Sequence, residues 1–471
     1  MRSILLGVVP DAWKKAHISP IHKKGNKADP NNYRPIALTS IACKVMEHIV
    51  RGRIIEHINY NSLFDSRQHG FISGRSCFPN LLQTMDAWTK LIEDGEDLDA
   101  VYLDFSKAFD TVPHERLLHK LSVYGIQDPL LSWIRSFVSG RKQRVVVGGE
   151  ASDWSDVISG VPQGSVLGPT LFLLYINDMP STANTSISLF ADDTKLYCPC
   201  KDHDLLQADL DMLCNWSSKW QLLFNTDKCK VVHIGRTNQQ LSYTMLDNQN
   251  ERHRLMSSVI EKDLGIFVDN KLSFDQHIQS IVKKANSLVG LIRRSFTYLD
   301  ERAFCTIFKA IVRPLLEYCN SIWYPSLAYH IDEIEHVQRR ATKLVPSLSL
   351  LPYHERLTRL KLPSLQYRRL RGDMIETYKL ITKKYSINPS TFFIFAEGPT
   401  RGHPYKIAKP RSQTSIRHHF FTNRIINSWN GLTNEIVSST SVNVFKNRLD
   451  KFWESHPLLY APRTPYNVLR P

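Results

Sequence analysis

Two adjacent acids, Asp192 and Asp193, interrupt two apolar segments of the kind that form strands. Ile187–Ala191 precedes the pair and Thr194–Tyr197 follows it, which predicts a β-hairpin with both carboxylates at its tip. A third acid, Asp104, stands at the end of another short apolar segment, which predicts a buried strand. Carboxylates at the ends of apolar strands are costly to bury unless a metal ion or another partner compensates them.

Acids in this pattern suit the transfer of phosphoryl or nucleotidyl groups. Mg²⁺ binds a few hard carboxylates and keeps positions open for phosphate oxygens and water. Two such ions about 3.5–4 Å apart neutralise the attacking and the leaving oxygen of the reaction. A pair of acids in a turn is also common without any metal, so the pair alone leaves both interpretations open.

The charge of the chain is unevenly distributed. The net charge is +15 over 471 residues, and residues 331–471 hold 23 Lys and Arg against 10 Asp and Glu. A basic C-terminal third favours a polyanionic partner such as nucleic acid. The longest apolar stretch, Val166–Ile176, contains Gly168 and Pro169 and is too short to span a bilayer, so we expect no membrane partner. The eight cysteines are too dispersed for a disulfide framework, which favours an intracellular protein.

Further motifs surround the three acids in a fixed order. They are Asn32-Tyr33-Arg34-Pro35-Ile36, Gln68-His69-Gly70-Phe71, Asp104 with Phe109, Gly160 to Pro169 with its Pro162-Gln163-Gly164 core, Phe190-Ala191-Asp192-Asp193, Asn225-Thr226-Asp227-Lys228 and Asp263-Leu264-Gly265-Ile266. Together these seven motifs, over roughly residues 13–295, resemble those of reverse transcriptases from LINE-type, jockey-like non-LTR retrotransposons. Such motifs are hypotheses until the structural context around them is known.

The resemblance implies an α+β right-hand polymerase fold. We expect N-terminally truncated fingers over residues 1–98, and a palm with a mainly antiparallel sheet and inserted fingers elements over 99–270. A helical thumb over 271–330 and a mostly helical, basic C-terminal region over 331–471 would follow. No segment resembles the endonuclease that precedes the polymerase in such elements, so we expect a truncated element copy or an internal start.

The resemblance also assigns roles at the acids. Asp104 and Asp192 would bind two Mg²⁺ ions, with Mn²⁺ as an alternative, and Asp193 would assist. Lys228 would protonate the leaving pyrophosphate, although a plain surface lysine is an equal alternative because general acids are hard to identify without geometry.

A second set of residues would bind the incoming nucleotide. Arg34, with Lys23 or Lys24, would clamp the triphosphate, as cations do in phosphoryl transfer. Phe109 would be a steric gate against the ribose 2′-hydroxyl, or a core residue, or both. Gln163 and Gly164 would line the incoming base pair, because glycine allows close approach of the backbone.

A third set would contact the primer and template. Leu264 and Gly265 resemble a primer-gripping turn. The pattern His277–Ser295 predicts an amphipathic helix that resembles the first thumb helix. Its basic residues would face backbone phosphates or form a solvated polar face; they are Lys283, Lys284, Arg293 and Arg294.

The predicted function is RNA-directed DNA polymerisation with an RNA template, a DNA primer and deoxynucleoside triphosphates as partners. By resemblance we expect the nucleus and cytoplasm as its location. One alternative is a noncatalytic nucleic-acid-binding remnant. Another is a viral RNA-directed RNA polymerase, although that family usually has Gly before its Asp-Asp pair and a small polar residue at the gate. Ala191 and Phe109 occupy these positions here and favour DNA synthesis.

Overall fold

The computed structural model describes residues 2–247, 249, 251–396 and 402–462. The chain folds into two compact units, each built from three segments. The first unit comprises Met1–Ser73, Asp99–Val231 and Gln239–Ser258, and the second comprises Gly74–Leu98, Val232–Asn238 and Val259–Pro471. The predicted division into fingers, palm, thumb and C-terminal region stays a prediction.

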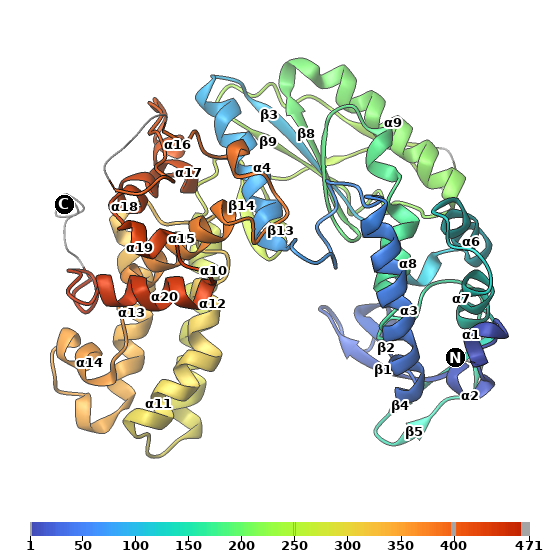
Figure 1. The fold of residues 1–471 in the computed structure, drawn as a ribbon, viewed down its shortest axis with the longest axis horizontal. Coiled ribbons are helices and arrows are strands. Elements are labelled where there is room, and N and C mark those ends of the chain that lie inside the picture. Colours follow the sequence, from blue (N-terminus) through green and yellow to red (C-terminus); the bar gives the residue numbers. More distant parts are fainter. Residues whose placement is uncertain (1, 248, 250, 397–401, 463–471) are drawn as a thin grey trace. The chain divides into compact units, whose positions relative to one another are not determined.

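A five-stranded sheet carries the predicted acids. Its strand order is β12-β9-β3-β8-β7, and Figure 1 shows β3, β8 and β9 side by side although they are far apart in sequence. β7 and β8 form an antiparallel hairpin, whereas β12 pairs with β9 in parallel. The strands are β3 (Leu98–Leu103), β7 (Ser186–Phe190), β8 (Asp193–Pro199), β9 (Lys230–Ile234) and β12 (Met256–Ser257).

A second sheet has the order β2-β1-β4-β5, with β6 paired to β4. β1 pairs antiparallel with β2, which sets Ile21 opposite Arg34, and parallel with β4, which sets Lys15 opposite Lys142. The turn between β1 and β2 therefore carries Lys23 next to the strand of Arg34. The strands are β1 (Lys15–His22), β2 (Tyr33–Leu38), β4 (Arg141–Val147), β5 (Glu150–Ala151) and β6 (Ser155–Val157).

Helices enclose a single large hydrophobic core in the first unit. α8 lies deepest, because every residue from Thr170 to Ile176 in it is buried. α6 packs against α7 and α8, and α9 packs against β8. The helices are α1 (Arg2–Leu5), α2 (Asp11–Lys14), α3 (Ile41–Tyr60), α5 (Ala108–Thr111), α6 (His114–Val123), α7 (Leu130–Val138), α8 (Gly168–Ile176) and α9 (His203–Trp220).

The second unit is mainly helical and contains one hairpin, β13 (Ile260–Asp263) with β14 (Ile266–Asp269). α10 packs on α13, and α4 packs on α16 (Figure 1). Arg417 forms a buried ion pair of 2.7 Å with Asp86, which ties the C-terminal segment to α4. The helices are α4 (Cys77–Glu93), α10 (Asp275–Ser295), α11 (Glu301–Ile307), α12 (Arg313–Glu317), α13 (Ala328–Ala341), α14 (Tyr353–Leu360), α15 (Leu365–Ile381), α16 (Ser415–His419), α17 (Phe421–Arg424), α18 (Ile426–Asn430), α19 (Asn434–Val437) and α20 (Val442–Phe452).

The predicted hairpin and the predicted amphipathic helix are both present, within two residues of their expected bounds. The buried residues of α10 include Ile278, Ile281, Ala285, Val289 and Ile292, which are members of the predicted apolar stripe. No helix among the described residues is long and apolar enough to cross a membrane.

Candidate active site

The two-residue turn of the β7–β8 hairpin presents Asp192. Phe190 pairs with Asp193, so Ala191 and Asp192 form the turn between them. Ala191 has a φ of +56°, a left-handed conformation that the hairpin turn requires. Asp192 is half-buried at this tip, whereas Asp193 is exposed at the first position of β8. The adjacent acids therefore experience different surroundings.

Gln68 holds this turn in place. Its side-chain Oε1 accepts hydrogen bonds from the backbone nitrogens of Gly70 and Ala191, both at 2.8 Å, and its Nε2 donates to the Ala191 carbonyl at 3.3 Å. Gln68 is buried, and the strand of Leu189 exchanges backbone hydrogen bonds with residues 67 and 69. A Cβ at position 70 would collide with the Ala191 backbone, so only glycine allows this approach.

Gln68 belongs to one of the sequence motifs, but the sequence indicated no role for it. Its function depends on a contact with a residue 123 positions away, which sequence spacing cannot reveal. The one available signal was a polar side chain two residues before a glycine in a motif of otherwise uncertain purpose.

The third acid, Asp104, follows β3 directly. Its carbonyl accepts a hydrogen bond of 2.8 Å from the Asn225 backbone nitrogen, and its own nitrogen lies 3.5 Å from the Cys229 Sγ. Just beyond it, the rings of Phe105 and Phe224 stack with centroids 4.4 Å apart. The segment Asn225–Cys229 therefore fixes the backbone of Asp104, and the same segment carries Lys228.

Lys228 lies beside the Asp104 carboxylate. Its Nζ is 3.2 Å from Asp104 Oδ2, although both side chains keep substantial exposure to solvent, 64% and 42%. A surface ion pair of this kind contributes little to stability. The position matters more than the energy, because it sets an ammonium group within reach of the oxygens that a metal-bound phosphate would occupy.

The pKa of Asp192 depends on the charges of Asp104, Arg34 and Lys23. Burial raises the pKa of Asp192 above its ordinary value, and the nearby Asp104 carboxylate raises it further. The positive charges of Arg34 and Lys23 act in the opposite direction and lower the pKa. Acids from two separate strands and cations from the β1–β2 turn thus act on one another at this end of the sheet.

These donors fit a site for divalent cations. The side chains offer hard carboxylate oxygens, and the raised pKa of Asp192 reflects a carboxylate whose negative charge lacks full compensation. Among the described residues, only Asp247, Glu251 and His253 place three ligand atoms within 4.8 Å of one another, at a surface turn. The ligand atoms of Asp104, Asp192 and Asp193 are not all within that distance of one another, so the three acids do not form a ready-made site for a single ion.

Phe109 and Gln163 lie near these acids on α5 and on the Pro162-Gln163-Gly164 loop. The Phe109 ring is half-buried and stacks on Phe172, with centroids 4.3 Å apart, so it is at least partly a core residue. Gln163 Nε2 donates a 3.0 Å hydrogen bond to Asp110 Oδ1 and lines a cavity of about 310 Å³. Burial raises the pKa of Asp110, while Gln163 lowers it.

Gly164 lies against β2. It has a φ of +113°, and a Cβ there would lie 2.5 Å from the Ala37 carbonyl oxygen, so no other residue fits. The Ala37 nitrogen in turn donates a 2.6 Å hydrogen bond to the Gln163 carbonyl. This loop is therefore tied to the strand that carries Arg34.

The structure separates the two lysine candidates. Lys23 acts electrostatically on both Asp192 and Asp110, whereas Lys24 is not among the charges that shift either carboxyl. Both lysines are exposed. The geometry therefore favours Lys23 as the partner of Arg34.

In the second unit, Leu264 and Gly265 form the turn of the β13–β14 hairpin. Their φ values are +44° and +94°, as a tight two-residue turn requires, and strand β14 begins directly after them at Ile266. The Tyr318 hydroxyl donates a 2.9 Å hydrogen bond to the Leu264 carbonyl, and its ring carbon Cε1 would lie 3.2 Å from a Cβ at Gly265. Tyr318 is a bracing residue that the sequence did not reveal.

The basic residues of α10 lie off its buried stripe. All four are exposed; they are Lys283, Lys284, Arg293 and Arg294. On the buried side, burial lowers the pKa of His277 to about 4, with smaller contributions from the positive charges of Lys284 and Lys262, so this imidazole is neutral near pH 7. The exposed positions suit either phosphate contacts or a solvated face.

The acids at a strand end and a hairpin tip, with cations acting on them, form the arrangement that the polymerase motifs predicted. Residues 21–287 match the family described as "Reverse transcriptase (RNA-dependent DNA polymerase)". The chain belongs to this family. The α+β right-hand polymerase class predicted from the motifs is confirmed with it.

Curated relatives agree with this family. The chain is 29% identical over 403 residues to the RNA-directed DNA polymerase from mobile element jockey of Drosophila melanogaster, and 30% identical over 406 residues to that of Drosophila funebris. Each alignment covers 81% of this chain and 42% of the relative, so the chain spans about two fifths of their length. A probable RNA-directed DNA polymerase from transposon X-element of Drosophila melanogaster is 28% identical over 73% of this chain and 38% of its own length. The predicted resemblance to jockey-like non-LTR elements is confirmed.

Among solved structures, apo telomerase from Candida tropicalis is similar, with 13% sequence identity and a TM-score of 0.43. That alignment covers 75% of this chain and 63% of the telomerase chain.

Replacing Gln68 by Met should lower kcat for nucleotide addition about 10- to 100-fold, because a catalytic group displaced by about 1 Å can cost 10²-fold. Met fills the same volume but leaves the Ala191 N–H without its acceptor, which should also destabilise the fold by about 1–3 kcal/mol. Steady-state kinetics and thermal unfolding measure the two effects.

The matched control is Gln207→Met. Gln207 likewise bridges the backbone of one residue, Thr244, with Oε1 accepting at 2.9 Å and Nε2 donating at 3.0 Å, but it lies away from the acids. It should lose stability and keep its kcat. Equal losses of kcat in both variants would show that Gln68 acts only on stability.

Replacing Asp192 by Asn should stabilise the metal-free protein while it abolishes activity. The pKa of Asp192 in the folded protein lies above the pKa of an Asp in the unfolded chain. The destabilisation that the charged Asp192 causes is therefore absent at pH values below the unfolded pKa. It grows as the pH rises through the folded pKa. With EDTA at pH 7.5 we expect a higher Tm for Asp192→Asn than for the wild-type protein, and the difference should shrink toward pH 4.

Asp193→Asn is the control, because Asp193 is exposed and its replacement should leave the Tm in EDTA nearly unchanged. Added Mg²⁺ should raise the Tm of the wild-type protein but not that of Asp192→Asn. A lower Tm for Asp192→Asn than for wild type in EDTA at pH 7.5 would contradict this account.

Proposed function

We propose that this chain is an RNA-directed DNA polymerase that extends a DNA primer along an RNA template, as part of a jockey-like non-LTR retrotransposon. The observation that carries the proposal is the electrostatic coupling of Asp192 to Asp104, Arg34 and Lys23. Two acids from separate strands, balanced by two cations, form the charge pattern that nucleotidyl transfer requires. Family membership supports the same activity.

In the proposed reaction, Asp104 and Asp192 hold a pair of Mg²⁺ ions, and Asp193 assists them. Bound there, the ions would neutralise the charge that develops on the attacking 3′-oxygen and on the leaving pyrophosphate. Gln68 keeps Asp192 in position by fixing the hairpin turn. The required cofactor is a divalent cation, with Mn²⁺ as an alternative to Mg²⁺.

Positively charged side chains of this chain orient the triphosphate and protonate the leaving pyrophosphate. Arg34 and Lys23 bind its oxygens from the β1–β2 turn, and their charge already acts on Asp192. Lys228, whose Nζ lies 3.2 Å from Asp104 Oδ2, would donate a proton to the leaving pyrophosphate. The proton passes from Nζ to an oxygen of the leaving group.

Phe109 and the Gln163–Gly164 loop select the nucleotide. The Phe172 ring supports one face of the Phe109 ring, which limits its ability to move away from a ribose 2′-hydroxyl. Gln163 and Gly164 line the base pair, and their loop is fixed on β2 by Ala37.

Leu264 and Gly265 hold the primer end, and the exposed cations of α10 contact backbone phosphates without reading sequence. The basic region 331–471 binds template or target, although residues 397–401 and 463–471 of it lie outside the described residues. We place the protein in the nucleus and cytoplasm.

Primer extension on an RNA template with Mg²⁺ tests the function directly. The wild-type chain should add deoxynucleotides, and the double variant Asp192→Ala, Asp193→Ala should lose at least about 10³-fold in rate because its metal ligands are gone. Asp153→Ala, which removes an exposed acid elsewhere in the first unit, is the control and should extend normally.

The noncatalytic alternative makes the opposite prediction. If the folded wild-type chain binds the primed template but extends it no faster than the double variant does, the protein is a nucleic-acid-binding remnant. Binding is measured separately by fluorescence anisotropy, so absence of activity and absence of binding are distinguished.

Replacing Phe109 by Val should admit ribonucleotides. The smaller side chain opens space beneath the sugar, so the ratio of kcat/KM for dNTP over rNTP should fall at least about 10-fold. Phe172→Leu removes the ring that supports the gate, so it should lower the same ratio by less than Phe109→Val does, and it should also destabilise the core. Unchanged discrimination in Phe109→Val would reject the gate.

A further inference from the structure

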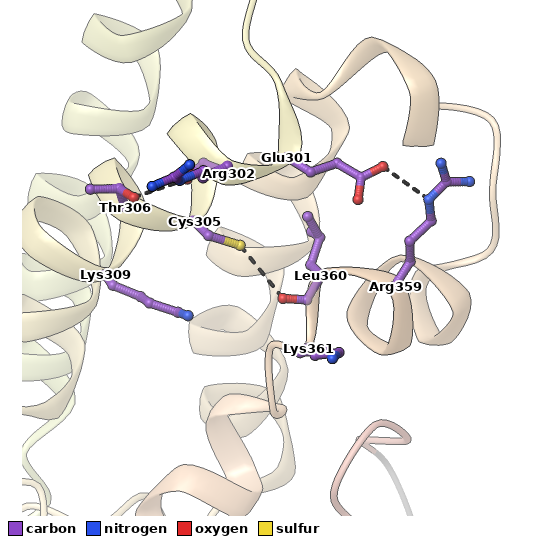
Figure 2. A pocket seen from close by; sticks show the side chains of 8 residues that line it. All are labelled: Glu301, Arg302, Cys305, Thr306, Lys309, Arg359, Leu360 and Lys361. Atoms are coloured by element: carbon purple, nitrogen blue, oxygen red, sulfur yellow. Dashed lines mark hydrogen bonds and ion pairs between the residues drawn. The ribbon is translucent and has the colours of Figure 1, made fainter.

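A positively charged groove lies in the second unit, and none of the residues that line it has been given an individual role above. It runs between α11, the π-helical turn Phe308–Val312 that follows, and α14, and it has a volume of about 410 Å³ (Figure 2). Single π-helical turns are rare and occur frequently at functional sites. The lining residues are Glu301, Arg302, Cys305, Thr306, Lys309, Arg359, Leu360 and Lys361.

Positive charge dominates this lining. Four of its residues are cationic: Arg302, Lys309, Arg359 and Lys361. The single carboxylate of the lining, Glu301, is already paired with the Arg359 Nε at 2.9 Å. The groove therefore carries a net charge of +3 and attracts an anion.

The shape of the groove favours an extended ligand. The four cationic side chains are exposed, and Figure 2 shows Cys305 and Leu360 between Lys309 on one side and the Glu301–Arg359 pair on the other. Arg302 and Lys309 are seven residues apart, which is about 10 Å along a helix. That separation exceeds the size of one phosphate, so these cations would meet successive phosphates of a strand.

We infer that this groove binds the phosphodiester backbone of a nucleic-acid strand. The inference rests on the proposed function for the class of partner and adds a defined site to it. Binding is electrostatic and independent of base sequence, because the four cationic side chains of the groove attract phosphates, which carry no sequence information.

Cys305 provides a direct probe of occupancy. Its thiol is partly exposed within the groove, and its Sγ lies 3.6 Å from the Leu360 carbonyl oxygen. A bound strand should cover it and slow its alkylation by N-ethylmaleimide at least about 5-fold at 50 mM salt, with recovery at 1 M salt. Cys200, which is partly exposed in the first unit, is the internal reference and is read in the same sample by mass spectrometry.

The probes are a 20-nucleotide RNA and, separately, inorganic phosphate at 10 mM. Protection of Cys305 by RNA but not by phosphate supports a strand-binding groove. Equal protection by both would overturn the strand assignment in favour of a small-anion site. No protection by RNA, under conditions where anisotropy shows the protein bound, would overturn the inference.

A charge reversal supplies the second test. In the double variant Arg302→Glu, Lys309→Glu, the slope of log K against log salt for RNA should fall by about 1.5, since each phosphate contact contributes about 0.7–0.9. The control, Arg254→Glu with Lys219→Glu, changes the net charge equally at exposed positions outside the groove and outside residues 331–471. Equal changes of slope in both variants would overturn the inference.

These outcomes are separate from those of the proposed function. If the wild-type chain extends primers but RNA leaves Cys305 unprotected, only the assignment of the groove is rejected. If RNA protects Cys305 but the chain extends no primer, the assignment of the groove stands and the polymerase assignment is rejected. Because alkylation is read on the wild-type protein, the test also survives a charge-reversed variant that does not fold.

Discussion

The Asp192 carboxylate is held at a hairpin tip, partly removed from water and close to the carboxylate of Asp104. Each of these conditions disfavours negative charge, and Arg34 and Lys23 compensate only in part, because the pKa of Asp192 remains raised. A protein normally neutralises or solvates such a group. Retaining it fits the proposed site for divalent cations, because a bound cation would compensate the charge that the metal-free fold leaves uncompensated.

Backbone hydrogen bonds keep the two acids in this unfavourable proximity. Gln68 fixes the turn of Asp192, and Asn225 fixes the strand end of Asp104. Both contacts act on main-chain atoms, so they define the position of the carboxylates and leave the oxygens free to bind ligands. Lys228 belongs to the same segment as Asn225. The position of Asp104 is therefore coupled to that of Lys228, the proposed proton donor to the leaving group.

The second unit uses the same combination of a rigid backbone and free charge. Leu264 and Gly265 both have left-handed backbone conformations in their turn, and a hydrogen bond from Tyr318 braces this turn. The cations of α10 and of the groove between α11 and α14 stay exposed, with their helices anchored by apolar residues on the opposite side. Exposed cations on rigid helices suit a polyanion that must slide, because they attract phosphate without fixing one register.

The sequence by itself determined the elements and the acids. Apolar segments around Asp192 and Asp104 predicted the hairpin and the strand, and a 3.6-residue period predicted α10, because these signals are local. The motif order determined the family, which the comparison with known proteins confirmed. Tertiary structure alone decided that Lys23 rather than Lys24 acts on Asp192, that Lys228 reaches Asp104, and that Gln68 and Tyr318 brace two functional turns. Each of these depends on contacts between residues distant in sequence, and no local pattern encodes which distant backbone a side chain will meet.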